Sequence, residues 1–441
     1  LAKIWSYNLS TDKLTELAQH DPALFTGANK LTNDEESSGV VDITSFLTTT
    51  AGYDTSKYNY FLVADQIHKG VTDPAEVVEM GQLTLMATSA QKVVPQQAFP
   101  TGTFLVGTEN RAAFKEIITS GEETNNGFRF NGIPDGIGVI DNGATLRVVV
   151  NHEFGNTAGA VRSHGSKGAY VSDLVIDKAS LAVISGGDFL KSANDLYLAN
   201  STGTAWTPGT TTAFARFCSG DLADVTAFKT ATAGYDGRIY LTGEENGADG
   251  RAFAHILTGT EAGRVYELPS LGNLSFENIV ANPIEQAKTI AVALDDSSTN
   301  GQVYLYIGTK AASGNAVEKA GLAGGKLFGV KVGSGAIATE VGDLTKPTET
   351  GLALTNGAGS FSLVDLGDVK GKDGATLNSD SITAAVTNFL RPEDGAWSLD
   401  GKSFYFATTA SATTASRLWA LEFSSSANPE NGGTIRMLLD G

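Results

Sequence analysis

Short strand-like runs recur along the whole chain and constrain its fold more than any other feature of the sequence. Each run has four or five residues, is rich in aromatic or aliphatic side chains, and in most cases stands near Gly, Asn, Asp or Pro. The runs are Lys3–Tyr7, Tyr60–Val63, Leu83–Met86, Leu146–Val150, Arg238–Leu241, Val303–Ile307 and Ser403–Phe406. Such spacing is typical of antiparallel meanders, so the sequence predicts an all-β protein.

Several of these runs belong to one repeated pattern of turn, strand, loop and strand. A turn, such as residues 236–238 or 399–402, precedes an aromatic strand, and a short loop then leads to a second strand such as Arg417–Leu421. Two strands joined in this way would form part of a four-stranded propeller blade. We therefore expect residues 1–441 to form a single β-propeller with six blades, and a two-sheet sandwich is the alternative architecture.

Helical patterns are few and short. Residues Asn110–Ser120 and Ser381–Phe389 carry apolar side chains near helical spacing, which predicts short helical insertions on the β scaffold. Residues 91–100 contain Pro95 and Pro100 and are interpreted as a connector between two parts of the propeller.

Composition excludes several classes of function. The formal net charge is −18, and binding nucleic acid through an overall basic surface would require clustered Lys and Arg that this chain lacks. No stretch approaches the ~20 apolar residues of a membrane-spanning helix. Cys218 is the one cysteine, which excludes an intramolecular disulfide and a Cys-rich zinc site.

The sequence begins with Leu1 rather than Met, so we expect it to be processed, trimmed or incomplete there, and a signal peptide would not be visible.

Six short clusters place acidic residues beside turn residues, several of them at strand ends. In a propeller, such loops gather at the central channel. Adjacent like charges repel, so the doublets Glu244-Glu245 and Asp295-Asp296 cost stability unless water or a cation neutralises them. The clusters are Asp34–Gly39, Asn151–Phe154, Thr242–Gly247, Ser275–Asn278, Leu294–Asp296 and Arg391–Gly395.

The segment Asn151-His152-Glu153 directly follows an apolar run that should be a buried strand, and an acid in such a place needs a partner. Glu153 is therefore either half of a structural ion pair or a metal ligand with His152 beside it. For His68 a structural role is favoured. Cys218 is either a small buried apolar residue or a thiolate ligand to iron, copper or zinc. The sequence contains neither a Gly-x-Ser-x-Gly elbow nor a Walker loop.

Taken in order, six of the motifs resemble those of the PhoX-type alkaline phosphatases, and the resemblance covers nearly the whole chain. Gly243 stands where that family has a second cysteine. The matching motifs are Asn151-His152-Glu153, Cys218-Ser219-Gly220, Glu244-Glu245-Asn246, Glu277, Asp295-Asp296 and Arg391-Pro392-Glu393.

The resemblance implies a propeller that binds calcium and iron, with Arg391 gripping the substrate phosphate. Its implied metal ligands are Glu153, Cys218, Glu244, Glu245, Glu277, Asp296 and Glu393. Five more residues are expected to lie beside the ligands, namely His152, Asp34, Glu35, Glu36 and Asp394.

The order of the matching segments is permuted. Residues 1–90 resemble the end of the family's chain, and residues 101–441 resemble its beginning and middle. A closed ring of blades tolerates such a cut, and a tandem array cut out of register would give the same order. A strand pair with an acidic loop, expected between Gly441 and Leu1, is absent from the sequence.

These patterns predict a metal-dependent phosphomonoester hydrolase that acts on small phosphate esters outside the cytoplasm, as a secreted, periplasmic or cell-surface protein. The alternative is a catalytically silent propeller that binds cations for stability and self-assembles in a surface layer, filament or matrix.

Overall fold

The computed structural model describes residues 1–89, 102–346, 348–411, 414 and 416–440. The chain divides into two compact units. The first unit comprises Leu1–Phe189 and Thr212–Ser219, and the second comprises Leu190–Thr211 and Gly220–Gly441. The expected connector, residues 91–100, lies outside the described residues, and the single domain 1–441 stays a prediction.

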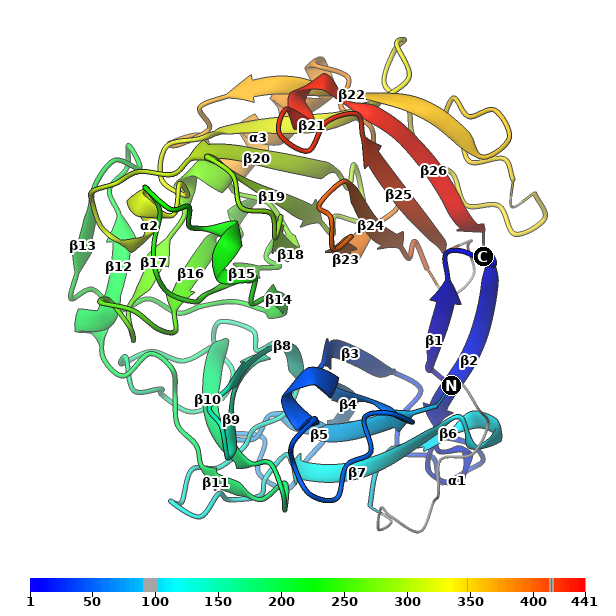
Figure 1. Ribbon diagram of the computed structural model, residues 1–441, viewed down its shortest axis with the longest axis vertical. Coiled ribbons are helices and arrows are strands. Elements are labelled where there is room, and N and C mark those ends of the chain that lie inside the picture. Colours follow the sequence, from blue (N-terminus) through cyan, green and yellow to red (C-terminus); the bar gives the residue numbers. More distant parts are fainter. Residues whose placement is uncertain (90–101, 347, 412–413, 415, 441) are drawn as a thin grey trace. The chain divides into compact units, whose positions relative to one another are not determined.

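The first unit is built from three antiparallel sheets (Figure 1). One is ordered β1-β2-β6, another β3-β4-β5-β7, and the third β11-β10-β9-β8. The strands are β1 (Lys3–Asn8), β2 (Lys13–His20), β3 (Glu35–Asp42), β4 (Asn59–Gly70), β5 (Glu79–Thr88), β6 (Leu105–Gly107), β7 (Ala112–Thr119), β8 (Pro134–Asp141), β9 (Thr145–His152), β10 (Tyr170–Asp177) and β11 (Val183–Ser185).

The second unit contains two larger sheets. One has the order β13-β12-β17-β16-β15-β14, and the other has the order β18-β19-β20-β21-β22-β26-β25-β24-β23. The division between the units falls within β14. The strands are β12 (Leu196–Ala199), β13 (Trp206–Pro208), β14 (Phe217–Asp221), β15 (Ile239–Glu244), β16 (Ala252–Ile256), β17 (Val265–Glu267), β18 (Phe276–Ala281), β19 (Lys288–Asp295), β20 (Val303–Thr309), β21 (Lys326–Val332), β22 (Ala358–Gly367), β23 (Pro392–Trp397), β24 (Ser403–Thr408), β25 (Arg417–Phe423) and β26 (Gly433–Asp440).

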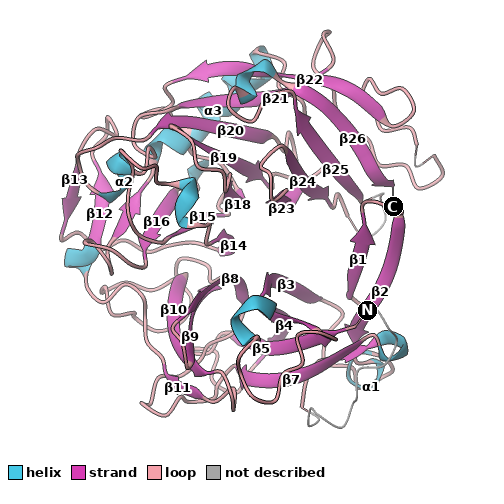
Figure 2. Cartoon of the chain, in the orientation of Figure 1, coloured by secondary structure: helices cyan, strands magenta, loops and turns pink. Residues whose placement is uncertain are grey.

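Helices are few and short in the described part of the chain (Figure 2). The α-helices are α1 (Pro22–Phe25), α2 (Ala316–Lys319) and α3 (Gly374–Thr383), and the remaining helical turns are short 3₁₀ segments. None of these helices is long and apolar enough to cross a membrane. The all-β expectation is confirmed at the level of a mostly β chain. The described strands form five sheets, two of them four-stranded, which does not confirm six blades.

All seven strand-like runs lie in strands, with Arg238 just before β15. The repeated pattern near the C-terminus is confirmed as well, because β24 and β25 pair antiparallel from Ser403↔Glu422 to Thr408↔Arg417. In the first unit, β9 illustrates why such runs become strands. β8 and β10 pair with it on its two edges, while Leu146, Val148 and Val150 pack into one apolar core.

The helix expected over Asn110–Ser120 is wrong, because β7 occupies Ala112–Thr119. This strand pairs with β5 and buries apolar side chains on both faces: Ala112 and Phe114 pack into one core, and Ala113 and Ile118 into another. Burial on two faces outweighs the helical spacing. The helix expected over Ser381–Phe389 is displaced, because α3 begins after the cap Asp373, whose side chain accepts a hydrogen bond from the Thr376 N–H, and ends at Thr383.

Candidate functional site: two carboxylate clusters

The first unit brings Asp135, Glu153 and Cys218 together, with one ligand atom of each within 4.8 Å of the others. Pairing of β8 with β9 sets Pro134 opposite His152, so the residues that follow them in the chain, Asp135 and Glu153, lie at the same end of the sheet. Asp135 and Cys218 are buried, and Glu153 is partly buried. We call this group the thiol cluster. Two carboxylates and one sulfur form a donor set that suits a transition metal such as iron or zinc.

Polar side chains hold the thiol cluster in place. The Gln66 amide on β4 donates from Nε2 to Asp135 Oδ2 at 3.0 Å and to Glu153 Oε2 at 3.1 Å. Arg216 Nη2 lies 2.6 Å from Glu153 Oε1. The Asn151 amide donates to the Cys218 carbonyl at 2.6 Å. The ion pair that the sequence left open for Glu153 is therefore present, and Glu153 also belongs to the cluster.

His152 has a structural role beside this cluster. Its Nδ1 lies 3.0 Å from the Gly132 carbonyl and its Nε2 lies 3.0 Å from Ser172 Oγ, so both ring nitrogens have protein partners. The ring stacks on Tyr170 with centroids 4.3 Å apart. Complete burial lowers the His152 pKa to about 3, which keeps the imidazole neutral.

The three consecutive acids Asp34, Glu35 and Glu36, at the start of β3, have different surroundings. Glu36 lies across from Gln66 in the β3–β4 register, the side of the sheet that carries the thiol cluster, and its carboxylate accepts a hydrogen bond from Ser38 at 2.6 Å. Glu35 instead accepts a hydrogen bond from the Ala2 N–H. Asp34 precedes β3, and its backbone carbonyl accepts from the His68 N–H.

The second unit brings Glu277, Asp296 and Glu393 together within the same 4.8 Å limit, and we call this group the carboxylate cluster. Glu277 on β18 and Asp296, which follows β19, are buried, and Glu393 on β23 is partly buried. The Asp296 N–H donates to the Ser275 carbonyl at 2.8 Å, which holds the end of β19 beside the start of β18. Three carboxylates are a donor set that suits a hard cation such as calcium.

Arg391 lies within the carboxylate cluster. Its Nε and Nη2 donate to the two Asp296 oxygens at 2.7 and 2.5 Å, and Nη2 lies 3.1 Å from Glu393 Oε1. Hydrogen bonding to Asp296 raises the pKa of the guanidinium. Arg391 has a φ of 52°, an uncommon left-handed conformation for a residue with a side chain. The planar fork expected to grip phosphate is thus bound to a carboxylate of the protein itself.

The remaining acids expected at the site have different surroundings. Both Glu244 oxygens pair with Arg251, at 2.7 Å to Nε and 2.9 Å to Nη2, and the carboxylate is buried while the guanidinium is partly buried. The charge of Glu245 contributes to the raised pKa of Arg391, so this side chain lies within electrostatic reach of the carboxylate cluster. Asp394 accepts hydrogen bonds from the Asn278 amide and from the Gly395 N–H.

Asp295 and Asp296, although consecutive, have opposite environments. Asp296 has the guanidinium of Arg391 as its counter-ion, whereas Asp295 is hydrogen-bonded to Ser297 and to the Ser275 backbone. Burial raises the pKa of the Asp295 carboxyl to about 7.

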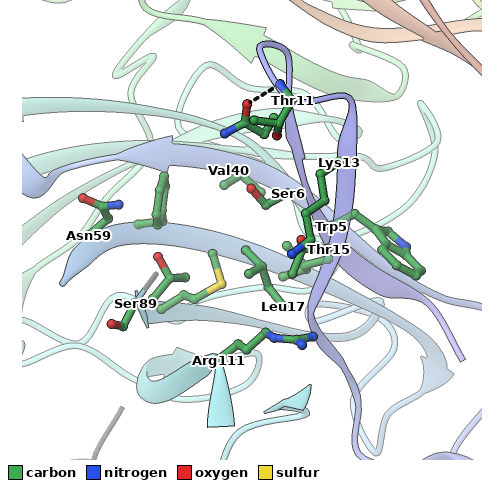
Figure 3. A pocket seen from close by; sticks show the side chains of 15 residues that line it. Trp5, Ser6, Thr11, Lys13, Thr15, Leu17, Val40, Asn59, Ser89 and Arg111 are labelled. Carbon is green, nitrogen blue, oxygen red and sulfur yellow. Dashed lines mark hydrogen bonds between the residues drawn. The ribbon is translucent and has the colours of Figure 1, made fainter. Parts of the chain in front are cut away.

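A separate cavity of about 530 Å³ lies in the first unit beside the β1–β2 hairpin (Figure 3). Trp5, Leu17 and Val40 supply apolar surface, and Lys13 and Arg111 supply positive charge. The described residues that line it include no Asp or Glu. It therefore lacks carboxylate donors for a cation.

Sequence reasoning missed Asp135 and Gln66. The signal for Asp135 was a lone acid between Pro134 and Gly136 at the start of a strand, and nothing in the local sequence marks Gln66.

Comparisons with known proteins give distant structural neighbours. No protein-family model and no curated protein matches the chain. The structure of Pseudomonas fluorescens PhoX in complex with vanadate, a transition state analogue, is 10% identical with a TM-score of 0.46, and the match covers 73% of this chain and 67% of that one. TolB from Acinetobacter baumannii is 10% identical with a TM-score of 0.25, over 81% of this chain and 60% of that one. At these values, the function has to be argued from the residues of this chain.

Proposed function

We propose that this chain is a metal-dependent phosphomonoester hydrolase that acts on small phosphate esters outside the cytoplasm. The observation that carries the proposal is the carboxylate cluster, in which Glu277, Asp296 and Glu393 converge and Arg391 lies among them. Hydrolysis of a phosphate ester needs charge neutralisation and positioning more than covalent help from the protein. A carboxylate-bound cation together with a guanidinium fork provides both.

The residues of the cluster have separate tasks in this proposal. Glu277, Asp296 and Glu393 would hold the cation, which when bound supplies Lewis-acid stabilisation of the phosphate oxygens. With the Asp296 oxygens bound to that cation, the Arg391 guanidinium would be free to grip two phosphate oxygens. Water then forms the new bond to phosphorus while the ester P–O bond breaks, and the protons of the water end on phosphate and on the leaving alcohol.

The thiol cluster supports the same proposal through a second metal. Asp135, Glu153 and Cys218 would hold iron or another transition metal, because thiolate is a soft ligand and the carboxylates are hard ones. Gln66 fixes the distance between the two carboxylates by donating to both.

A chromogenic phosphomonoester tests the proposal directly. We expect turnover by protein loaded with calcium and iron, loss of turnover in chelator, and loss of at least a hundredfold in Arg391→Ala. Arg436→Ala is the matched control, since Arg436 forms an exposed ion pair with Glu422 at 2.8 Å. Metal content is measured by elemental analysis. Absence of turnover by protein that carries both metals would refute hydrolysis.

One observation favours the alternative, a cation-binding protein without catalysis that serves in a surface assembly. The Arg391 fork is already paired with Asp296, so this carboxylate has a counter-charge and the guanidinium is occupied without a phosphate. In that case, metal removal lowers stability and changes self-association, measured by light scattering, and no variant alters turnover. Export is checked separately by fractionation of the producing cells.

A further inference from the structure

A small cavity of about 140 Å³ lies in the second unit, where the loop that follows β19 meets α3. Asp295 lines it from the end of β19, Ser297 and Thr299 line it from the loop, and Asn378 lines it from α3. Asp295 is the one charged side chain among the described residues of its lining. We call it the Asp295 cavity, and it is distinct from the carboxylate cluster because none of Glu277, Asp296 and Glu393 lines it.

The buried carboxylate of Asp295 is incompletely satisfied. Its Oδ1 accepts from the Ser275 N–H at 3.1 Å and from Ser297 Oγ at 2.7 Å, whereas Oδ2 accepts no hydrogen bond from the described residues. The residue is 7% exposed, and burying a carboxylate without a counter-charge is costly. The neighbouring Asp296 has Arg391 as a counter-ion, and Asp295 has no ion pair within the described part of the chain.

A second buried oxygen, on a residue that lines the cavity, also lacks a partner among the described residues. Asn378 Oδ1 is buried and receives no hydrogen bond from the described residues. Ser297, Thr299 and Asn300 also line the cavity; the Ser297 hydroxyl donates to Asp295 Oδ1, and Asn300 Oδ1 accepts a hydrogen bond from the Asn388 amide. Tyr304 forms an aromatic wall and is itself fully buried.

We propose that the Asp295 cavity binds a hard, oxygen-seeking divalent cation of the calcium type, as a site separate from the carboxylate cluster. One carboxylate oxygen, one amide oxygen and nearby hydroxyls are the donor types that calcium prefers, and the lining offers no sulfur or imidazole. The volume accommodates the ion with a few waters, since each water occupies roughly 30 Å³. A single carboxylate predicts weak binding, with a dissociation constant on the order of 10⁻⁴ to 10⁻³ M.

The proposed ion would also explain how the Asp295-Asp296 doublet is tolerated. Asp296 is neutralised by Arg391, and Asp295 would be neutralised by the ion in the cavity. The same ion would fix the loop between β19 and β20, where Asn300 has a φ of 60°. This inference does not depend on phosphate hydrolysis, because a silent protein could hold the same ion.

Terbium luminescence and calcium titration test the site. Tyr304 in the cavity wall should sensitise emission from bound Tb³⁺, and Ca²⁺ should quench that emission by displacement. Asp295→Asn keeps the shape and the hydrogen bonds of the side chain but removes its charge. We expect this variant to bind one Ca²⁺ fewer by calorimetry, or to bind it at least tenfold more weakly, and to lose the sensitised emission. Tyr304→Phe should lose the emission and keep the calcium.

Glu393→Gln is the matched control, because it changes the carboxylate cluster and leaves the Asp295 cavity intact. It should keep the Tyr304-dependent emission. Asn378→Ala provides a second variant should Asp295→Asn fail to fold, and it should weaken Ca²⁺ at this site several-fold. Equal calcium stoichiometry and affinity in wild type, Asp295→Asn and Asn378→Ala would overturn the proposal and leave a cavity that holds water alone.

Discussion

The guanidinium of Arg391 forms two hydrogen bonds with the carboxylate of Asp296, with Nε 2.7 Å from Oδ1 and Nη2 2.5 Å from Oδ2. This arginine offsets one of the three negative charges that Glu277, Asp296 and Glu393 bring together. A bound cation and Arg391 therefore serve the same electrostatic purpose for Asp296.

Arg391→Ala should make the stability of the protein depend on divalent cations. In chelator, we expect the free energy of unfolding to fall by about 1–3 kcal/mol, because the carboxylates lose their counter-charge. Calcium should restore most of the loss by taking the place of the guanidinium. Chemical denaturation with and without calcium measures this. Arg436→Ala should change stability by less than about 0.5 kcal/mol in either condition, and an equal loss in both conditions for Arg391→Ala would contradict cation binding at the cluster.

Glu244→Gln separates a structural ion pair from a metal ligand. Glu244 is 2% exposed and gives both of its oxygens to Arg251. We expect a loss of about 1–3 kcal/mol in unfolding free energy, since the variant leaves a partly buried guanidinium without its counter-ion. The number of bound metal ions should not change, as measured by elemental analysis after dialysis. Loss of one metal equivalent with little change in stability would assign Glu244 to the metal instead. Glu422→Gln, in an exposed pair, is the control.

Cys218→Ser should selectively weaken transition-metal binding by the thiol cluster. Oxygen in place of sulfur removes the soft ligand but keeps the size, and the side chain is buried where it stands. Titration with Co²⁺ measures this through the thiolate-to-cobalt charge-transfer band, which should appear in wild type and be absent in the variant. Calcium binding should be unaffected. A wild-type protein that binds Co²⁺ without that band would show that Cys218 is a small buried apolar residue.

His255 should make the folded state less stable as the pH falls. It is 2% exposed on β16, and burial lowers its pKa to about 3. The imidazole of the unfolded chain becomes protonated near pH 6.5, whereas the native imidazole stays neutral down to about pH 3. The contribution of His255 to the free energy of unfolding is therefore complete above pH 6.5 and is lost as the pH falls towards 3. The difference in unfolding free energy between wild type and His255→Gln should shrink by about 1.4 kcal/mol per pH unit between roughly pH 6 and pH 4. A difference that is constant over this range would mean that the imidazole is protonated in the native state.

The strands could be predicted because their evidence is local. Runs such as Leu146–Val150 or Val303–Ile307 carry their own apolar pattern, and each lies in a strand. The segment Ala112–Thr119 shows where this reasoning fails, because its conformation is decided by pairing with β5 and by two apolar cores that approach it from opposite faces. No window of the sequence contains that information.

The same contrast applies to the candidate site, where some residues are marked by their local sequence and others are brought in only by the fold. Glu153, Cys218, Glu277, Asp296 and Glu393 stand out as acids or a thiol next to apolar runs, and the structure places them in the two clusters. Asp135 was missed because the β8–β9 register brings it to Glu153, 18 positions later in the chain. Gln66 was missed because it reaches the cluster from another sheet, 87 positions before Glu153. The pairing of Glu244 with Arg251 likewise becomes visible only when the two side chains are placed.

The division within β14 has a consequence for how the protein is made. The chain leaves the first unit after Phe189, returns at Thr212 and leaves again after Ser219. During synthesis, Asp135 and Glu153 emerge long before Cys218, so the first unit lacks its last eight residues, 212–219, until they leave the ribosome. A fragment ending at Phe189 would contain the two carboxylates without the sulfur, so the metal binding proposed for the thiol cluster would need residues 212–219 as well.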